Sequence, residues 1–124
     1  MIVDIILVAY PLMKIITKVL DFKKLKEMTA MFGNMVKAVV DIERELLALD
    51  AELHSDLEAL LLEDGSKQEN LWGINLYPGM PVNDFIEFDS MINMRPSQGN
   101  RSRGVESEEI RKRIIEIVNK VITR

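Results

Sequence analysis

Residues 36–63 read VKAVVDIERELLALDAELHSDLEALLLE, and the structure that this stretch adopts decides the fold. Over residues 36–48, apolar side chains occupy one parity and most charged side chains the other, which predicts a half-buried strand. If residues 50–51 form a tight loop, Val40 faces Leu61 and the apolar residues of two strands meet on one face. The stretch therefore predicts a β-hairpin.

The alternative for the second half of this stretch is a helix. Ser55-Asp56-Leu57-Glu58 has the spacing of a capping box, and the leucines that follow would form one helical face. The hairpin accounts for more of the pattern, because the polar residues also fall opposite one another, with Glu45 facing Asp56. We therefore expect a strand rather than a helix after the loop.

The flanking segments supply the remaining elements. Asp21 is the expected N-cap of a helix that stops at Gly33-Asn34, and Ser107 is the expected N-cap of a C-terminal helix. Alternating side chains predict further strands over residues 71–77 and 84–95. The expected fold is α+β, an antiparallel β-meander of about four strands with the N-terminal helix and the C-terminal helix packed on one face.

Composition limits the class of protein. A chain of 124 residues with 48% hydrophobic residues fits a single domain spanning residues 1–124. A net charge of -4 argues against a protein that coats nucleic acid or anionic membrane by bulk attraction. The absence of cysteine excludes disulfides and thiolate metal sites, and the expected location is cytoplasmic.

The apolar start of the chain, residues 1–20, does not have the pattern of a signal peptide or a membrane anchor. Asp4 interrupts it, Pro11 splits it, and two lysines follow. The letters MKIIT after Pro11 read like a natural protein start. We therefore expect residues 1–12 to be an extension from an upstream start codon and residues 13–124 to be the domain.

Three stretches carry a resemblance to known proteins. They are ELH at residues 52–54, GSKQENLWGINLYP at 65–78 and INMRPSQGNRS at 92–102. The second has the signature Gly-Ser-x-Gln-x-x-Leu-Trp-Gly-x-Asn-x-Tyr-Pro, and together they resemble a small prokaryotic family of unknown function from about residue 13 onward. The resemblance implies no activity. It departs at Asp50-Ala51, where similar proteins tend to have Gly-Gly.

The preferred site hypothesis is an anion site in the loop after the fourth expected strand. Arginine forks bind carboxylate or phosphate in bidentate fashion, and the amides at a helix start favour anions. Trp72 or Tyr77 could offer a stacking surface. The alternative is that Arg95 pairs with Glu87 or Asp89 while the other loop arginines are solvated. The expected ligand-binding residues are Asn75, Arg95, Asn100 and Arg101.

A second hypothesis is a divalent metal site on the acidic side of the expected sheet. His54, the single histidine, would lie there with Glu45 and Asp56, and a bound ion would relieve the repulsion between facing carboxylates. Such an ion could activate water for hydrolysis, which would make the protein a metal-dependent hydrolase. A solvated acidic face is the alternative interpretation.

A third hypothesis is a protein–protein interaction module, because a sheet covered on one side leaves its other side open to a partner. We expect a binding protein rather than an enzyme, acting as a monomer or homodimer. The expected partner is a small anionic ligand or another protein, with nucleic acid not favoured and no membrane. The sequence names no cofactor.

Overall fold

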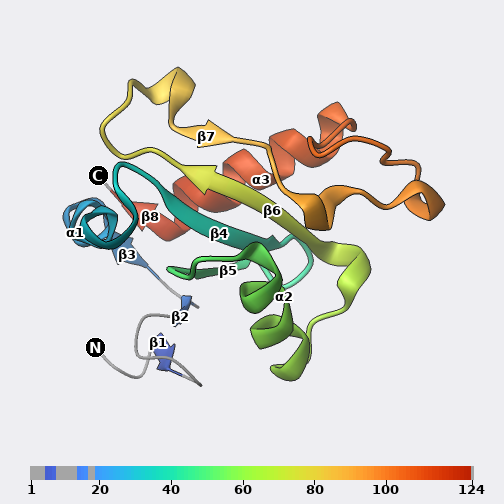
Figure 1. The fold of residues 1–124 in the computed structure, drawn as a ribbon, viewed down its shortest axis with the longest axis horizontal. Helices are drawn as coiled ribbons and strands as arrows, with labels where there is room; N and C mark the ends of the chain where they lie inside the picture. The colour runs from blue at the N-terminus through green and yellow to red at the C-terminus, as the bar shows by residue number, and fades with distance from the viewer. Residues whose placement is uncertain (1–4, 8–13, 17–18, 124) are drawn as a thin grey trace.

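The computed structural model describes residues 5–7, 14–16 and 19–123 of the chain (Figure 1). The helices are α1 (Phe22–Phe32), α2 (His54–Glu63) and α3 (Glu108–Val121). The strands are β1 (Ile5–Leu7), β2 (Lys14–Ile16), β3 (Leu20–Asp21), β4 (Val36–Asp41), β5 (Leu46–Leu49), β6 (Leu71–Leu76), β7 (Ile86–Glu87) and β8 (Ile122–Thr123). Short 3-10 turns are η2 (Gln68–Asn70), η3 (Val82–Asp84), η4 (Met91–Asn93) and η5 (Pro96–Gln98).

Within the described residues, six strands form one sheet in the order β1-β2-β5-β4-β6-β7. Every neighbouring pair in this sheet is antiparallel. A separate parallel pair joins β3 to β8, so Leu20 lies beside Ile122. The α+β class is confirmed, but the sheet is wider than the four expected strands and β4, not the segment after residue 51, lies beside β6. None of the described helices is long and apolar enough to span a membrane.

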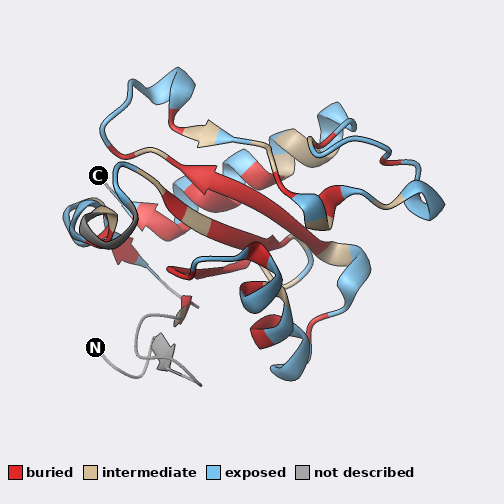
Figure 2. Cartoon of the chain, in the orientation of Figure 1, coloured by how far each residue is buried: buried red, intermediate tan, exposed pale blue. Residues whose placement is uncertain are grey.

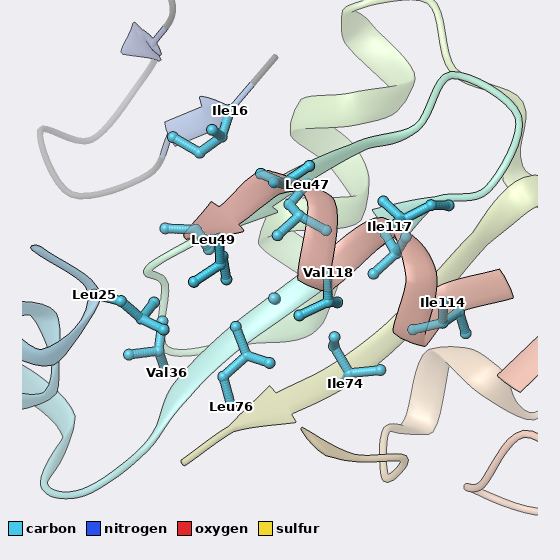
Figure 3. Packing of buried hydrophobic residues seen from close by; sticks show 14 of the residues in the cluster. Ile16, Leu25, Val36, Leu47, Leu49, Ile74, Leu76, Ile114, Ile117 and Val118 are labelled. Carbon is cyan, nitrogen blue, oxygen red and sulfur yellow. The ribbon is translucent and has the colours of Figure 1, made fainter. Parts of the chain in front are cut away.

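The N-terminal and C-terminal helices both contribute to the hydrophobic cluster on one face of the sheet. Asp21 caps α1 by accepting a hydrogen bond from the backbone N–H of Lys23, and Ser107 caps α3 in the same way through Ile110. The apolar stripe of α3 packs against the central strands (Figure 3). Labelled members of this cluster are Ile16, Leu25, Val36, Leu47, Leu49, Ile74, Leu76, Ile114, Ile117 and Val118.

The opposite face of the sheet is covered by α2. Leu57, Leu60 and Leu61 are buried in a second cluster that includes Val39 and Ala48. With helices on both sides, β6 is buried along its whole length (Figure 2). The expectation of a water-exposed acidic sheet face is therefore wrong.

The expected hairpin around residues 50–51 is also wrong, because the segment that follows is helix α2. His54, Leu57 and Leu61 recur at helical spacing on its buried side, and this face fills the space over the sheet. The capping box is not formed either, since the N-cap is Leu53, two residues before Ser55, and it makes no side-chain cap hydrogen bond. The helical spacing of the leucines was therefore the correct indicator of structure. The match of polar residues across two expected strands was coincidental.

The long first strand expected over residues 36–48 is split by a turn. The Asp41 carboxylate accepts hydrogen bonds from the backbone N–H groups of Glu43 and Arg44, both at 2.9 Å, and this bends the chain. Glu45 has a positive φ of 57° and returns the chain into β5. Its carboxylate contacts Lys120 and Arg113 of α3, each at 2.7 Å, which lowers the pKa of Glu45 to about 2.

The fourth expected strand, residues 84–95, is reduced to the two residues of β7. Ser90 accepts a hydrogen bond from the backbone N–H of Ile92 and starts η4, which turns the chain out of the sheet. Ile92 packs into the cluster beneath α2, while Met94 is exposed. The alternation of residues 84–95 thus reflects two separate packing environments rather than one strand.

Residues 1–12, the expected start-codon extension, lie outside the described residues except for β1. Nothing in the structure tests that expectation.

Asp50, at the end of β5, has a backbone conformation and a burial that are unfavourable for the stability of the fold. Its φ is 77°, its side chain is buried, and its Oδ1 has no hydrogen-bond partner among the described residues. Burial raises the pKa of Asp50 above its usual 3.8, against the opposing charge of Lys14. A left-handed backbone is unfavourable for residues with a side chain, and glycine relieves it.

Asp50→Gly is expected to raise the free energy of unfolding by about 1 kcal/mol at neutral pH, net of the added freedom of the unfolded chain. Because the pKa of Asp50 is raised by folding, its carboxylate destabilises the native state only once it ionises. The gain should therefore be smaller near pH 4 and grow as the pH rises through the native pKa. Urea unfolding at several pH values measures it.

Asp50→Asn is the matched control, since it removes the charge and keeps the positive φ. The difference in unfolding free energy between Asp50→Asn and Asp50→Gly should not change with pH, whereas the difference between wild type and Asp50→Gly should. A destabilised Asp50→Gly variant at neutral pH would contradict this account.

Candidate functional site

The free edge of β6 beyond the end of β7 is closed by one side chain, Asn93. Its Oδ1 accepts from the backbone N–H of Gly73 at 2.8 Å, and its Nδ2 donates to the Gly73 carbonyl at 3.0 Å. The same Nδ2 donates to the carbonyl of Arg103 at 2.9 Å. Asn93 is fully buried and acts as a substitute for the missing strand neighbour. It joins η4 and the following loop to the sheet.

A second amide, Asn100, holds that loop in shape. Its Nδ2 donates to the carbonyls of Asn93 at 2.7 Å and Gly104 at 2.8 Å, and its Oδ1 accepts from the backbone N–H of Glu106 at 2.8 Å. The loop also closes on itself, because Arg95 and Asn100 exchange backbone hydrogen bonds. The side chain of Asn100, expected to contact ligand, is buried and fully engaged in loop structure.

The side chain of Arg95 extends from this loop to Trp72 of β6. Its guanidinium carbon is 4.2 Å from the centroid of the Trp72 ring, a distance typical of a cation–π contact. Its Nη1 donates to the backbone carbonyl of Gln68 in η2. Gln98 adds a bond to the carbonyl of Glu69 at 3.2 Å, so η5 is fastened to η2 beside the arginine. These contacts fix the guanidinium in one orientation.

The remaining edge of the Arg95 guanidinium is unsatisfied. Nε and Nη2 are buried and have no hydrogen-bond partner among the described residues, and the same is true of the indole Nε1 of Trp72. Burial lowers the pKa of Arg95, while the carboxylate of Glu58 opposes this effect. Buried donors are almost always paired, so three unpaired ones on two stacked side chains indicate that an acceptor belongs there.

Asn75 belongs to a different polar group, on the α2 side of β6. Its Nδ2 donates to Glu87 Oε1 at 2.9 Å and to the carbonyl of Asp89 at 3.2 Å. The Tyr77 hydroxyl donates to the same Glu87 oxygen at 2.9 Å. Tyr77 and Glu87 line an open cavity of about 400 Å³ with Met80, which is separate from the Arg95 contacts.

The three expected metal ligands are not brought together. His54 is buried and its Nε2 donates to the carbonyl of Ile74 at 2.7 Å, while burial lowers its pKa. Asp56 is exposed on α2, and Glu45 is bound to the cations of α3. No three histidine, aspartate or glutamate side chains lie close enough to hold a metal ion in the part of the chain that the structure describes.

The loop arginines are also separated. Arg101 is exposed, and its backbone N–H donates to the carboxylate of Glu106 at 2.8 Å. Arg103 Nε donates to Asp89 at 2.6 Å, so Asp89 pairs with Arg103 and not with Arg95. Of the four expected ligand-binding residues, Arg95 alone has buried side-chain donors without a partner among the described residues.

Sequence reasoning missed Gln68, Asn93 and Glu58. Asn93 joins the loop that carries Arg95 to β6, and Gln68 and Glu58 interact with Arg95 itself. The first two lie within the stretches that carry the resemblance, 65–78 and 92–102, and the structure shows that these stretches pack against each other. The occurrence of both motifs in one chain was the signal that could have predicted this contact. Glu58 had no such signal, because it was expected to lie on a strand.

The chain matches the family model described as a protein of unknown function, DUF5674, over residues 14–121. No curated protein and no solved structure matches the chain. The matched range includes both packed stretches and the Arg95 environment. The chain is a member of the DUF5674 family of proteins of unknown function.

Proposed function

We propose that the protein binds a small anionic ligand through the guanidinium of Arg95. The single observation that supports this function is the buried, unpaired Nε and Nη2 of Arg95, next to an indole N–H that is also unpaired. In a guanidinium, the N–H bonds of Nε and Nη2 point in the same direction. This is the pair of donors that a carboxylate or phosphate accepts in bidentate fashion. We call these two atoms the Arg95 fork.

The surroundings favour recognition rather than a purely structural arginine. Trp72 holds one face of the guanidinium and Gln68 holds Nη1, so little side-chain entropy is lost when a ligand binds. Burial strengthens each hydrogen bond to the ligand, because water no longer competes. A guanidinium that is oriented in advance on an aromatic ring is well suited to bind a carboxylate group.

Ligand entry requires side chains to move, because the atoms of the Arg95 fork are buried. The side chains next to it are suited to this. Gln98 is exposed and makes one long bond at 3.2 Å to Glu69, and Gln68 reaches Glu58 at 3.4 Å. Rotation of exposed side chains is fast and leaves the backbone in place.

The test is a titration of ¹⁵N-labelled protein with formate, acetate, phosphate and sulfate, followed by NMR. Trp72 is the single tryptophan, so its indole N–H gives one signal that needs no assignment. We expect saturable shifts of this signal and of the Arg95 Nε–H in wild type. Arg95→Lys should weaken binding about tenfold or more, because lysine keeps the charge and loses the fork.

Arg101→Gln is the matched control, since it removes an exposed arginine of the same loop. It should leave the titration unchanged. Circular dichroism of each variant confirms that it is folded. Equal affinities in Arg95→Lys and wild type, or a loss of binding in Arg101→Gln, would contradict the proposal.

A further inference from the structure

The carboxylate of Glu58 shares a neighbour, Gln68, with the guanidinium of Arg95. Gln68 contacts both groups, since its backbone carbonyl accepts from Arg95 Nη1 and its side-chain Nε2 donates to Glu58 Oε2 at 3.4 Å. Among the described residues, no hydrogen bond joins Glu58 to Arg95. Glu58 is half-buried on α2 and is held near the arginine by a neighbour rather than by the arginine itself.

The charge of Glu58 acts on Arg95 and on whatever binds there. Its carboxylate favours the charged form of Arg95 and raises the pKa of that group, against the lowering by burial. A ligand at the Arg95 fork therefore meets one positive charge and one nearby negative charge. Glu58 repels a ligand with two negative charges twice as strongly as a ligand with one, and this repulsion offsets the stronger attraction of the double charge to Arg95.

The geometry of the unpaired donors also favours a carboxylate over a tetrahedral anion. The Arg95 fork supplies two parallel N–H groups in one plane, which match the two oxygens of a carboxylate. A tetrahedral phosphate or sulfate has further oxygens that also need donors in a buried site. Apart from the indole N–H of Trp72, no other unpaired buried side-chain donor is found in the part of the chain that the structure describes.

We propose that Glu58 makes the Arg95 fork selective for ligands with a singly charged carboxylate over doubly charged phosphate or sulfate. This inference rests on the proposed function. Glu58 is then a specificity-determining residue, and the ligand class is that of monocarboxylic acids or of peptides and metabolites that present one isolated carboxylate.

The test compares two small probes, formate and sulfate, on wild type and Glu58→Gln by the same NMR titration at pH 7. Glutamine keeps the size of the side chain and removes its charge. Glu58→Gln is expected to tighten sulfate binding about tenfold and formate binding about threefold, so the preference for formate falls. Glu69→Gln is the matched control, because it removes an exposed carboxylate from the neighbouring turn η2 and should change neither affinity.

The outcomes separate this inference from the proposed function. If wild type binds formate through Arg95 and Glu58→Gln leaves the formate-to-sulfate ratio unchanged, the role of Glu58 is refuted and the anion site stands. If neither protein responds to either probe, both proposals fail. If Glu58→Gln alone binds sulfate, the exclusion of double charge by Glu58 is supported directly.

Discussion

Replacing Asn93 with alanine is expected to lower the free energy of unfolding by about 4 kcal/mol, because two buried backbone groups lose their partner at once. These groups are the N–H and carbonyl of Gly73, while the carbonyl of Arg103 keeps the hydrogen bond that it accepts from the backbone N–H of Ser90. An unpaired buried polar group costs about 1 to 3 kcal/mol, and the fully buried site offers no water to replace the amide. Urea unfolding, followed by circular dichroism, measures the loss.

Two further variants show whether hydrogen bonding is the cause. Asn93→Asp has nearly the same shape but replaces the donor Nδ2 with an acceptor, so it should destabilise the protein by a similar amount and recover partly at low pH. Asn83→Ala removes an exposed asparagine and should leave stability within about 0.5 kcal/mol of wild type. A mild effect of Asn93→Asp at pH 7 would show that side-chain volume, not hydrogen bonding, matters there.

Gly73→Ala is expected to destabilise the protein by about 3 kcal/mol, through overpacking where η4 crosses β6. An added Cβ would lie 2.5 Å from the Cβ of Ser90 and 3.1 Å from Cγ1 of Ile92. Ser90 cannot rotate away from this contact, because the clash is with its Cβ, and its hydroxyl also caps η4. The backbone must therefore shift, which also strains the bonds that Asn93 makes to Gly73.

A double-mutant cycle tests the steric origin of this effect. Ser90→Gly removes the clashing atom, so the pair Gly73→Ala and Ser90→Gly should be more stable than the sum of the single changes predicts. Gly79→Ala is the control, since nothing lies within 4 Å of its added Cβ. A purely additive cycle would show that Gly73 is required for its backbone and not for the close approach of Ser90.

The regular elements that were predicted well share one property, which is that local chemistry and burial agree. The helix of residues 108–121 has a serine cap, acidic residues in its first turn and an apolar stripe, and the structure confirms each. The strand of residues 71–76 was also predicted correctly, and it is buried along its length. The structure of residues 54–63 was predicted wrongly because leucines at neighbouring positions satisfy both a strand and a helix period, and only packing against the sheet decides between them.

The environment of Arg95 could be predicted in part only. Its side-chain type and its place in a loop identified it as an anion-binding candidate, but the same reasoning selected Asn100 and Arg101. Pattern cannot tell a carboxamide that binds loop carbonyls from one that faces a ligand, since both belong to polar, turn-rich sequence. The distinction depends on which donors are left unpaired after folding, and this is a property of the assembled structure.

The division of the interior between two faces of the sheet has a consequence for synthesis on the ribosome. The cluster beneath α2 draws on residues between Ile15 and Leu71, with Ile92 packed against it. The cluster on the other face needs Ile114 and Val121, which are synthesised after every residue of the first cluster. Because a chain emerges from its N-terminus, the first layer can collapse while the second still exposes its apolar strands. During synthesis, one face of the sheet is therefore expected to stay exposed to solvent until α3 has been made and packs against it.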